Sequence, residues 1–445
     1  MPTERSRILR LALPAVVNNI SLTLMQTVDM VFVGGLGPEA LGAVGTMGTL
    51  IWAIMTLVDG LATGITAVVA RHVGAQDWEG AQTAGRTGLV AALGLALFLT
   101  PFLIVGREEL LKLISLPHEI WEPSEAYFHV FLWFLPLAFT RNAVDAVHRA
   151  GGAAVAPTLI TVLSNLINIS LDPLLIYGGW GLPALGTGGA ALATGIATVV
   201  ALGVQSGLLH GTRWSPFGGT VVSRREARTI IDIGFPSTLE QGAMAISQNL
   251  IIAWAVNPLG ALSAASFQIT MRLSSLSFTP AFGFGMAAIV LVGQALGAQN
   301  RQLARNLGWK TTWYAVGTLL ALSVVYWWFA APLATLFTAD ARVIELSVWP
   351  LRIYALTMGF LGATMVLAPA LRGAGDTRYT LRTMVVSRFG VRLPLAWLLG
   401  IGMGWGLNGV WMGMGADFIV RGVLLGARFS GSAWENKITY GERPP

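Results

Sequence analysis

Long apolar stretches recur along the whole sequence, and they constrain the fold more than any other feature. Each stretch has roughly 20 or more residues, enough to cross about 30 Å of hydrocarbon as a helix. Because the runs are continuous rather than alternating, outer-membrane strands fit poorly. Twelve spans are predicted, at approximate residues 8–33, 44–70, 82–105, 123–147, 155–177, 187–209, 229–256, 264–295, 305–330, 344–370, 379–401 and 406–429. We therefore predict an all-α integral membrane protein.

The composition agrees with a membrane protein. The 445 residues are 54% hydrophobic and 11% charged, whereas soluble domains have about 25% charged residues. The chain has no cysteine, which excludes disulfides and thiolate metal sites. The first apolar run is too long for the hydrophobic core of a signal peptide, so it is expected to belong to the fold.

The basic residues predict the topology. With twelve spans both termini lie on one side, and that side receives most of the arginines, whereas the opposite loops hold only Arg107, Lys112 and Arg342. By the positive-inside rule the termini are cytoplasmic. We expect a multi-pass protein of the plasma (inner) membrane, in contact with lipid and monomeric. The net charge of +6 is explained by this topology, so no nucleic-acid partner is expected.

The two halves of the chain resemble each other. A shift of 223 residues aligns VGAQ at 73–76 with LGAQ at 296–299, and Ser164 with Ser387; near the front, Pro14 pairs with Pro236. Six helices per half make the halves parallel repeats around a central cavity, as in alternating-access transporters. The predicted domains are an N-lobe (1–210), a cytoplasmic linker (211–227), a C-lobe (228–430) and a cytoplasmic tail (431–445).

Catalytic and ATP-binding motifs are missing. The three lysines are Lys112, Lys310 and Lys437, and none follows a glycine as a Walker A lysine does. HEIWE at 118–122 lacks the second histidine of a zincin motif. We therefore predict a non-enzyme without a cofactor, in which any uphill transport is driven by an ion or by the substrate's own gradient. Channels and structural membrane proteins remain open at this point.

Two carboxylates lie inside predicted spans without a basic partner on their own helix. A charged residue in a membrane helix costs about 2.5–3.5 kcal/mol on insertion scales and is by default a functional candidate. Asp29 and Asp172 both lie late in helices that start on the cytoplasmic side, so they are expected at similar depth in the outward half. A shared site is therefore plausible in geometry.

The stretch NLINISLDP around Asp172 is rich in hard oxygen ligands. Asn165, Asn168 and Asp172 fall on one helical face, and Pro173 removes a backbone donor and should free a carbonyl one turn earlier. Asn18 similarly shares a face with Asp29. These groups suit a proton or Na⁺. The alternative is a satisfied polar cluster that only holds this helix against a neighbour.

Other polar and methionine residues are weaker candidates. Asp145 and Asp417 have arginines at four-residue spacing and are predicted to form helical ion pairs, and only Arg272 is predicted as a mid-membrane cation. Asp59 and Glu240 stay open between a cavity role and a structural hydrogen bond. Methionines adapt to varied apolar ligands. The predicted cavity set is Asn18, Met25, Gln26, Met55, Asp59, Glu240, Met244 and Gln268.

The chain resembles the multidrug and toxic compound extrusion (MATE) family of cation-coupled exporters, with matches in both halves, in order and at the expected spacing. The segments that carry the resemblance are LALPA (11–15), VDMVFVGGLG (28–37), ARHVGAQD (70–77), LDPLLIYG (171–178), GGAALAT (188–194), GFPSTLEQ (234–241), FQITMRLSSLSFTPAFGFG (267–285), VGQALGAQN (292–300) and LRGAGDT (371–377). The resemblance implies a two-lobed exporter that exchanges H⁺ or Na⁺ for amphipathic, often cationic compounds.

The branches of the family differ in where the cation binds. In the DinF-like and archaeal branch the coupling set matches Asp29, Asn168, Asp172 and Thr194, and Pro14 matches a bending proline. These four residues would also form any Na⁺ site. In the NorM-like branch the acids lie in the C-lobe; Glu240 matches one, but helix 10 has no carboxylate beyond Glu345 just before it. The resemblance thus favours N-lobe coupling.

Two rival functions remain at the level of sequence. The wider superfamily includes flippases for lipid-linked saccharides, which often carry extra helices or a strongly cationic cavity. A passive channel or a structural membrane protein is the second rival. Coupling at Asp29 and Asp172, with rearrangement of helix 1 near Pro14, is the leading hypothesis.

Overall fold

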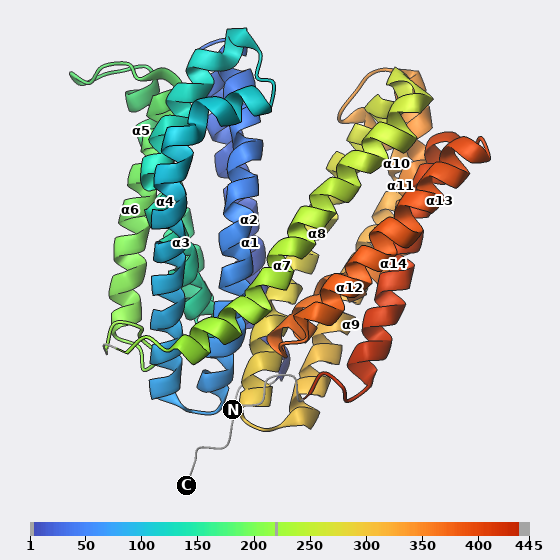
Figure 1. The fold of residues 1–445 in the computed structure, drawn as a ribbon. Coiled ribbons are helices and arrows are strands. Elements are labelled where there is room, and N and C mark those ends of the chain that lie inside the picture. Colours follow the sequence, from blue (N-terminus) through green and yellow to red (C-terminus); the bar gives the residue numbers. More distant parts are fainter. Residues whose placement is uncertain (1–3, 219–220, 436–445) are drawn as a thin grey trace. The chain divides into compact units, whose positions relative to one another are not determined.

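The computed structural model describes residues 4–218 and 221–435. The regular elements in this part of the chain are helices, and the one β-type contact is an isolated bridge between Gly179 and Leu182. Of the predicted linker, residues 219–220 lie outside the described residues, and so do residues 436–445 of the predicted tail. The all-α prediction is confirmed (Figure 1).

The first half of the chain forms six long helices, and the short 3₁₀ turn η1 (His118–Ile120) precedes the fourth. Their bounds are α1 (Glu4–Gly34), α2 (Pro38–Gly74), α3 (Trp78–Leu113), α4 (Trp121–Ala150), α5 (Val155–Ile176) and α6 (Gly186–His210). Pro14 and Pro173, predicted to bend or open α1 and α5, each lie inside a helix that continues past them.

The second half repeats this order with more interruptions. Its elements are α7 (Arg224–Ile251), η2 (Ile252–Val256), η3 (Asn257–Leu259), α8 (Ala261–Gly297), α9 (Arg301–Trp328), α10 (Ala330–Thr335), α11 (Ala341–Gly373), α12 (Thr377–Ser387), η4 (Arg388–Arg392), α13 (Leu393–Trp397), η5 (Leu398–Gly402) and α14 (Gly406–Ser430). Because η4 and η5 are π-helical and directly continuous with their neighbours, residues 377–402 form one interrupted span.

The duplication is visible in the backbone as well as in the sequence. Gly37 and Gly260, 223 residues apart, have positive φ angles of 116° and 88° and begin α2 and α8, which have 37 residues each. The Asp77 side chain caps α3 by accepting from Gly80 N, and Asn300 caps α9 by accepting from Leu303 N. The prediction of two six-helix repeats is confirmed.

The helices have the surface of membrane spans. Ten helices in the described chain are long and apolar enough to cross a bilayer, and α7 and α9 fall outside this set although their repeat partners α1 and α3 belong to it. The side chains of Phe98, Phe102 and Val105 on α3 are 75%, 73% and 85% exposed. Large apolar side chains that point outward are suited to lipid.

Small residues allow close helix packing inside each half. A Cβ added to Gly189 of α6 would lie 2.3 Å from the Leu175 carbonyl oxygen of α5, and one added to Gly409 of α14 would lie 2.4 Å from the Leu399 carbonyl carbon of η5. Such contacts let backbones approach as they do in membrane bundles. Thus α5 packs against α6, and the interrupted span packs against α14, in the same manner.

By packing, the chain divides into two compact units whose limits lie inside helices. One unit is Val17–Gly234, and the other is Met1–Val16 together with Phe235–Pro445. The limits fall within three residues of Pro14 in α1 and Pro236 in α7. The start of α1 therefore packs with the second half, and the start of α7 with the first. The division into an N-lobe at 1–210 and a C-lobe at 228–430 follows helix membership and stays a prediction.

Candidate functional site

The two predicted carboxylates lie together inside the unit Val17–Gly234. Asp29 of α1 and Asp172 of α5 lie close enough for their carboxyl groups to interact directly. Asp172 is fully buried, Asp29 is partly buried, and Asp172 Oδ2 has no hydrogen-bond partner among the described side chains. Two ionised carboxylates at this proximity repel each other, and a proton on one of them relieves the repulsion.

Asn168 and Thr194 complete this cluster, one from α5 and one from α6. When the Asn168 amide is oriented so that both its ends are satisfied, Nδ2 donates to Asp29 Oδ1 at 2.8 Å and Oδ1 accepts from Thr194 Oγ1 at 3.2 Å. The reverse orientation gives Nδ2 contacts of 3.5 Å to Asp172 Oδ1 and 3.2 Å to Thr194 Oγ1 but leaves the amide oxygen facing only acceptors, so we adopt the first. The four residues of the predicted coupling set are therefore adjacent, while their role in coupling stays a prediction.

Asn165 has a different environment from the one predicted. Its Nδ2 lies 3.0 Å from the Ser21 carbonyl oxygen and 2.7 Å from Ser21 Oγ on α1. The bond ties α5 to α1 about two turns before Asp29, and the structure places Asn165 against Ser21 rather than against the acids. Asn165 therefore positions the helices that carry the acids.

Tyr127 of α4 belongs to the cluster although the sequence reasoning did not select it. It interacts electrostatically with both Asp29 and Asp172 and packs against the buried group formed by Val33, Ile176 and their neighbours. Nothing local marks this residue, because an aromatic near the start of a membrane helix is also typical of the interfacial belt. Only the packing of α4 beside α1 and α5 identifies it.

Asp59 and Asp145 are held by amides on neighbouring helices. Asn142 Nδ2 of α4 donates to Asp59 Oδ1 at 2.8 Å, and Arg149 adds an electrostatic interaction. Gln205 of α6 donates to Asp145 Oδ1 at 2.7 Å, and no ion pair of Asp145 appears in the described part of the chain. The predicted contact ion pair of Asp145 does not form, because its carboxylate is directed at α6, although Arg141 and Arg149 both attract it electrostatically.

Glu240 is neutralised inside the other unit. Its carboxylate accepts from Arg372 at 2.7 Å and from Thr380 Oγ1 at 3.3 Å. A paired acid of this kind has a sufficient structural reason to be there. The contact joins α7 to α11 and α12, and sequence spacing could not have revealed it.

The other cavity candidates are divided between the two units. Asn18, Met25 and Met55 are partly buried and Gln26 is exposed in one unit, while Met244 and Gln268 are exposed in the other. A cavity shared by all of them stays a prediction. No group of three or more histidine, cysteine or acidic side chains that could hold a metal occurs in residues 4–218 and 221–435. A Na⁺ ion would depend on oxygens of Asp29, Asn168, Asp172 and Thr194.

The second unit contains buried cations that the sequence reasoning missed. Arg388 and Arg392 lie within the interrupted span, 6% and 2% exposed, whereas Arg272, the predicted mid-membrane cation, lies on an exposed side of α8. The prediction that Arg272 stands alone at mid-membrane is therefore wrong. The predicted ion pair between Asp417 and Arg421 is confirmed at 2.9 Å.

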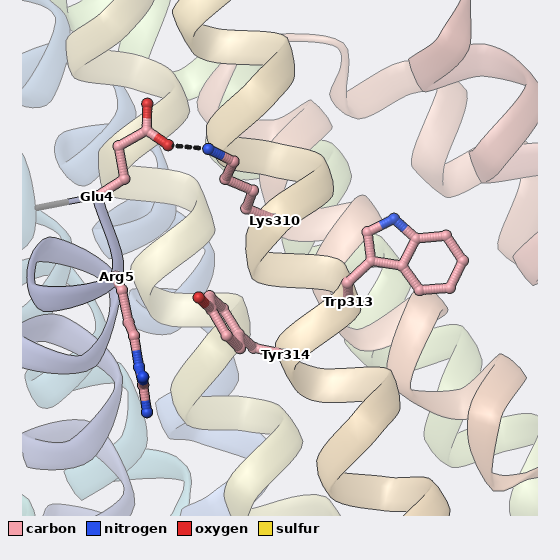
Figure 2. A pocket seen from close by; sticks show the side chains of 5 residues that line it. All are labelled: Glu4, Arg5, Lys310, Trp313 and Tyr314. Atoms are coloured by element: carbon pink, nitrogen blue, oxygen red, sulfur yellow. Dashed lines mark hydrogen bonds and ion pairs between the residues drawn. The ribbon is translucent and has the colours of Figure 1, made fainter.

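A surface hollow lies at the start of α1, in the unit that does not contain Asp29 and Asp172. It is lined by Glu4 and Arg5 of α1 and by Lys310, Trp313 and Tyr314 of α9, all in one unit. Figure 2 shows Lys310 directed at the Glu4 carboxylate, with which it forms an ion pair. Because this hollow holds a satisfied ion pair and no unpaired buried acid, we do not assign the transport site to it.

Comparison with known proteins agrees with the duplicated architecture. The MatE family model matches residues 14–174 and again residues 236–398. A protein of Bradyrhizobium diazoefficiens called "Probable multidrug resistance protein NorM" is 30% identical over 95% of this chain and 92% of its own length. A Thermotoga maritima protein of the same name is 28% identical over 98% of this chain and 94% of its own.

Solved structures show the same fold. The protein described as "Crystal structure of MATE in the bent conformation" has a TM-score of 0.89 and 26% identity, with 96% of each chain covered. Since the family model covers well over half of the sequence in two successive matches, the chain belongs to the MatE family of multidrug and toxic compound extrusion (MATE) transporters.

Proposed function

We propose that this chain is a proton-coupled multidrug exporter in which Asp29 and Asp172 form the coupling site. MATE proteins are transporters rather than enzymes, and the NorM relatives are called multidrug resistance proteins, so a multidrug efflux transporter is the function supported by relatives. The observation that carries the coupling proposal is the pair of adjacent carboxyl groups inside membrane helices, with Asn168 donating to Asp29 and the buried Asp172 Oδ2 without a partner among the described residues. A proton shared by such a pair removes the repulsion between the two charges.

The coupling step follows from charge. A proton that enters from outside neutralises the pair, and Asn168 and Thr194 hold the carboxyl groups in place through the bonds at 2.8 and 3.2 Å. Asp29 is on α1, so a change in its bonding acts on the helix that contains Pro14. Loss of negative charge weakens the attraction for a cationic, amphipathic drug, which then leaves outward. When the site next faces the cytoplasm the proton dissociates, completing an alternating-access cycle.

The remaining details of the proposal come from the sequence. The protein works as a multi-pass monomer in the plasma (inner) membrane with both termini cytoplasmic, surrounded by lipid. Met25 and Met55 provide adaptable apolar contacts to varied substrates. Na⁺ is the alternative coupling ion, because the cluster also offers amide and hydroxyl oxygens.

The test is dye efflux from proteoliposomes under a pH gradient and, separately, under a Na⁺ gradient. Wild-type protein is compared with Asp172→Asn and with Glu39→Gln, an exposed acid at the start of α2 that serves as the matched control. We expect the pH gradient alone to drive uphill dye movement in wild type and in the control, and not in Asp172→Asn. Uphill movement driven by Na⁺ alone would replace H⁺ by Na⁺ in the proposal. Full activity of Asp172→Asn would overturn it.

A flippase for a lipid-linked saccharide is the second candidate, and the buried Arg388 and Arg392 favour it specifically. Arginine side chains suit phosphate groups, as in a lipid pyrophosphate. A deletion strain that accumulates the lipid-linked precursor, and is corrected by this chain, would support the flippase. Uphill dye export without such accumulation would exclude it.

A further inference from the structure

A cluster of arginines lies where the interrupted span meets α14. Arg388 and Arg392 are the first and last residues of the π-helical segment η4, and Arg421 is on α14. Short π-helical segments inside α-helices are rare and frequently mark functional sites. All members of the cluster belong to the unit that contains Phe235–Pro445.

Only part of this charge is compensated. Asp417 Oδ2 lies 2.9 Å from Arg421 and 3.9 Å from Arg392, and Ser387 Oγ donates to Asp417 Oδ1 at 2.6 Å. Arg392 also donates to Gln248 Oε1 of α7 at 2.8 Å. Asp417 thus balances one of the three arginines. The nearby Glu240 forms its ion pair with a fourth arginine, Arg372, and makes no ion pair with the other three among the described residues.

Arg388 is the member without a partner. It is 6% exposed, its Nε atom is buried without a hydrogen bond, and within residues 4–218 and 221–435 its guanidinium group makes no ion pair. It feels the repulsive charges of Arg392 and Arg421 as well as the attraction of Asp417 and Glu240. Burying an uncompensated charge is strongly destabilising, so packing alone does not explain this side chain.

The repeat shows that Arg388 is not required by the fold. Ser164 Oγ donates to the Ala197 carbonyl oxygen at 3.1 Å, and the equivalent Ser387 Oγ donates to the Asp417 carbonyl oxygen, also at 3.1 Å. The residue after the serine is Asn165 in the first half and Arg388 in the second. The same helix contact therefore forms with a neutral amide at this position.

We propose that Arg388 and Arg392 form a binding site for an oxyanion, a carboxylate, sulfonate or phosphate, carried by the exported amphiphile. The planar guanidinium group offers paired donors that match such a group. The inference rests on the proposed export function and adds to its substrates amphiphiles that carry a negative group beside their apolar body. Gln248 and Asp417 hold Arg392 in place, and Arg388 supplies the unpaired charge.

The test uses two dyes that differ in one group. Rhodamine 110 has a free carboxylate, and its methyl ester rhodamine 123 does not. Their affinities are measured by fluorescence polarisation on the full chain in phosphatidylcholine nanodiscs, for wild type, Arg388→Met, Arg388→Lys and the control Arg382→Met, an exposed arginine of α12. We expect Arg388→Met to weaken the affinity for rhodamine 110 about tenfold and to leave the affinity for rhodamine 123 unchanged. Arg388→Lys should lose less affinity for rhodamine 110 than Arg388→Met does. Arg382→Met should bind both dyes with the wild-type affinities.

A stability measurement separates this site from a structural role. Because Arg388 has no partner to lose, Arg388→Met should unfold at the same or a higher temperature than wild type. A clearly lower unfolding temperature together with an equal loss of affinity for both dyes would overturn the proposal. An unchanged preference between the dyes in a stable Arg388→Met protein would overturn it as well.

A second binding measurement, made with an anionic lipid present, identifies the source of the oxyanion. The rhodamine 110 measurement is repeated in discs that contain phosphatidylglycerol. If this lipid weakens the binding of rhodamine 110 to wild type but not to Arg388→Met, a lipid phosphate binds the same site and the oxyanion assignment stands. Failure of this inference leaves gradient-driven export of rhodamine 123 intact, whereas failure of the proposed function abolishes that export in wild type itself.

Discussion

The span α5 and the interrupted span from α12 to η5 are repeats of one element, yet they carry opposite charge. Each contains a serine that donates to a carbonyl of the next long helix at 3.1 Å. After that serine, α5 carries Asn165, Asn168 and Asp172, while the other span carries Arg388 and Arg392 and changes to π-helix. A duplicated scaffold has thus kept its packing while one half carries buried acid and amide groups and the other carries buried arginines.

The two clusters also differ in how their charge is satisfied. In the first half, two acids face each other with an amide and a hydroxyl, and no arginine or lysine forms an ion pair with them within the described chain. In the second half, Asp417 is surrounded by Arg421, Arg392 and Ser387. An acid that lacks a fixed counter-ion can exchange a proton, whereas a paired acid is structural. The comparison leads to four predictions.

The largest expected effect is loss of coupling from Asp29→Asn. Without one carboxyl group the pair cannot share a proton, so pH-driven dye efflux from proteoliposomes should fall by about tenfold or more, a barrier change of about 1.4 kcal/mol or more. The thermal unfolding temperature should stay near the wild-type value. Efflux at the wild-type rate would show that Asp172 works without its neighbour.

Asp417→Asn should instead affect stability. Asp417 is the one acid that pairs with Arg392 and Arg421 among the described residues, so removing it leaves buried cations unpaired, which typically costs about 3–5 kcal/mol. The same change at Asp172 leaves no buried cation unpaired and should cost far less. Thermal unfolding in detergent compares the two variants directly. Equal decreases in unfolding temperature would mean that both acids are structural.

The two repeat-equivalent serines offer a finer comparison. Ser164→Ala loses the neutral hydrogen bond to the Ala197 carbonyl oxygen, worth about 0.5–1.5 kcal/mol, and a long 3.4 Å bond from Arg141. Ser387→Ala also loses the bond to the Asp417 carboxylate, and bonds to charged groups are worth about 1.5–3 kcal/mol. We expect Ser387→Ala to lower the unfolding temperature more than Ser164→Ala does. The reverse order would contradict the view that Asp417 is ionised.

The smallest effects should come from the equivalent helix caps of α3 and α9. Asn300→Ala removes one capping bond, at a typical cost of about 1 kcal/mol. Asp77→Ala removes the same kind of cap and also a 2.9 Å contact with His72, so it should cost more. The unfolding temperatures of both variants, measured beside wild type, test this order.

The sequence predicted the fold and most of the first cluster because both leave local signals. Long apolar runs specify helices, and a carboxylate in such a run is conspicuous, so Asp29, Asp172 and Asn168 were predicted without knowledge of packing. Thr194 needed the family resemblance, since a threonine in GGAALAT has no unusual feature of its own.

The missed features are those created by tertiary contacts. Tyr127 joins the acids only through the packing of α4, and the pairing of Glu240 with Arg372 spans 132 residues. Asp145 was predicted to pair along its own helix, but its carboxylate turns to Gln205. Arg388 and Arg392 were overlooked because the basic residues were used for topology, in which arginines near helix ends are expected outside the membrane.

The central claim is that substrate and proton compete through Asp29 and Asp172. The most direct measurement is proton release when saturating rhodamine 123 is added to the purified protein in weakly buffered nanodiscs, followed with a pH indicator. The account predicts release from wild type and from Arg388→Met, and none from Asp172→Asn. Undiminished release from Asp172→Asn would contradict it.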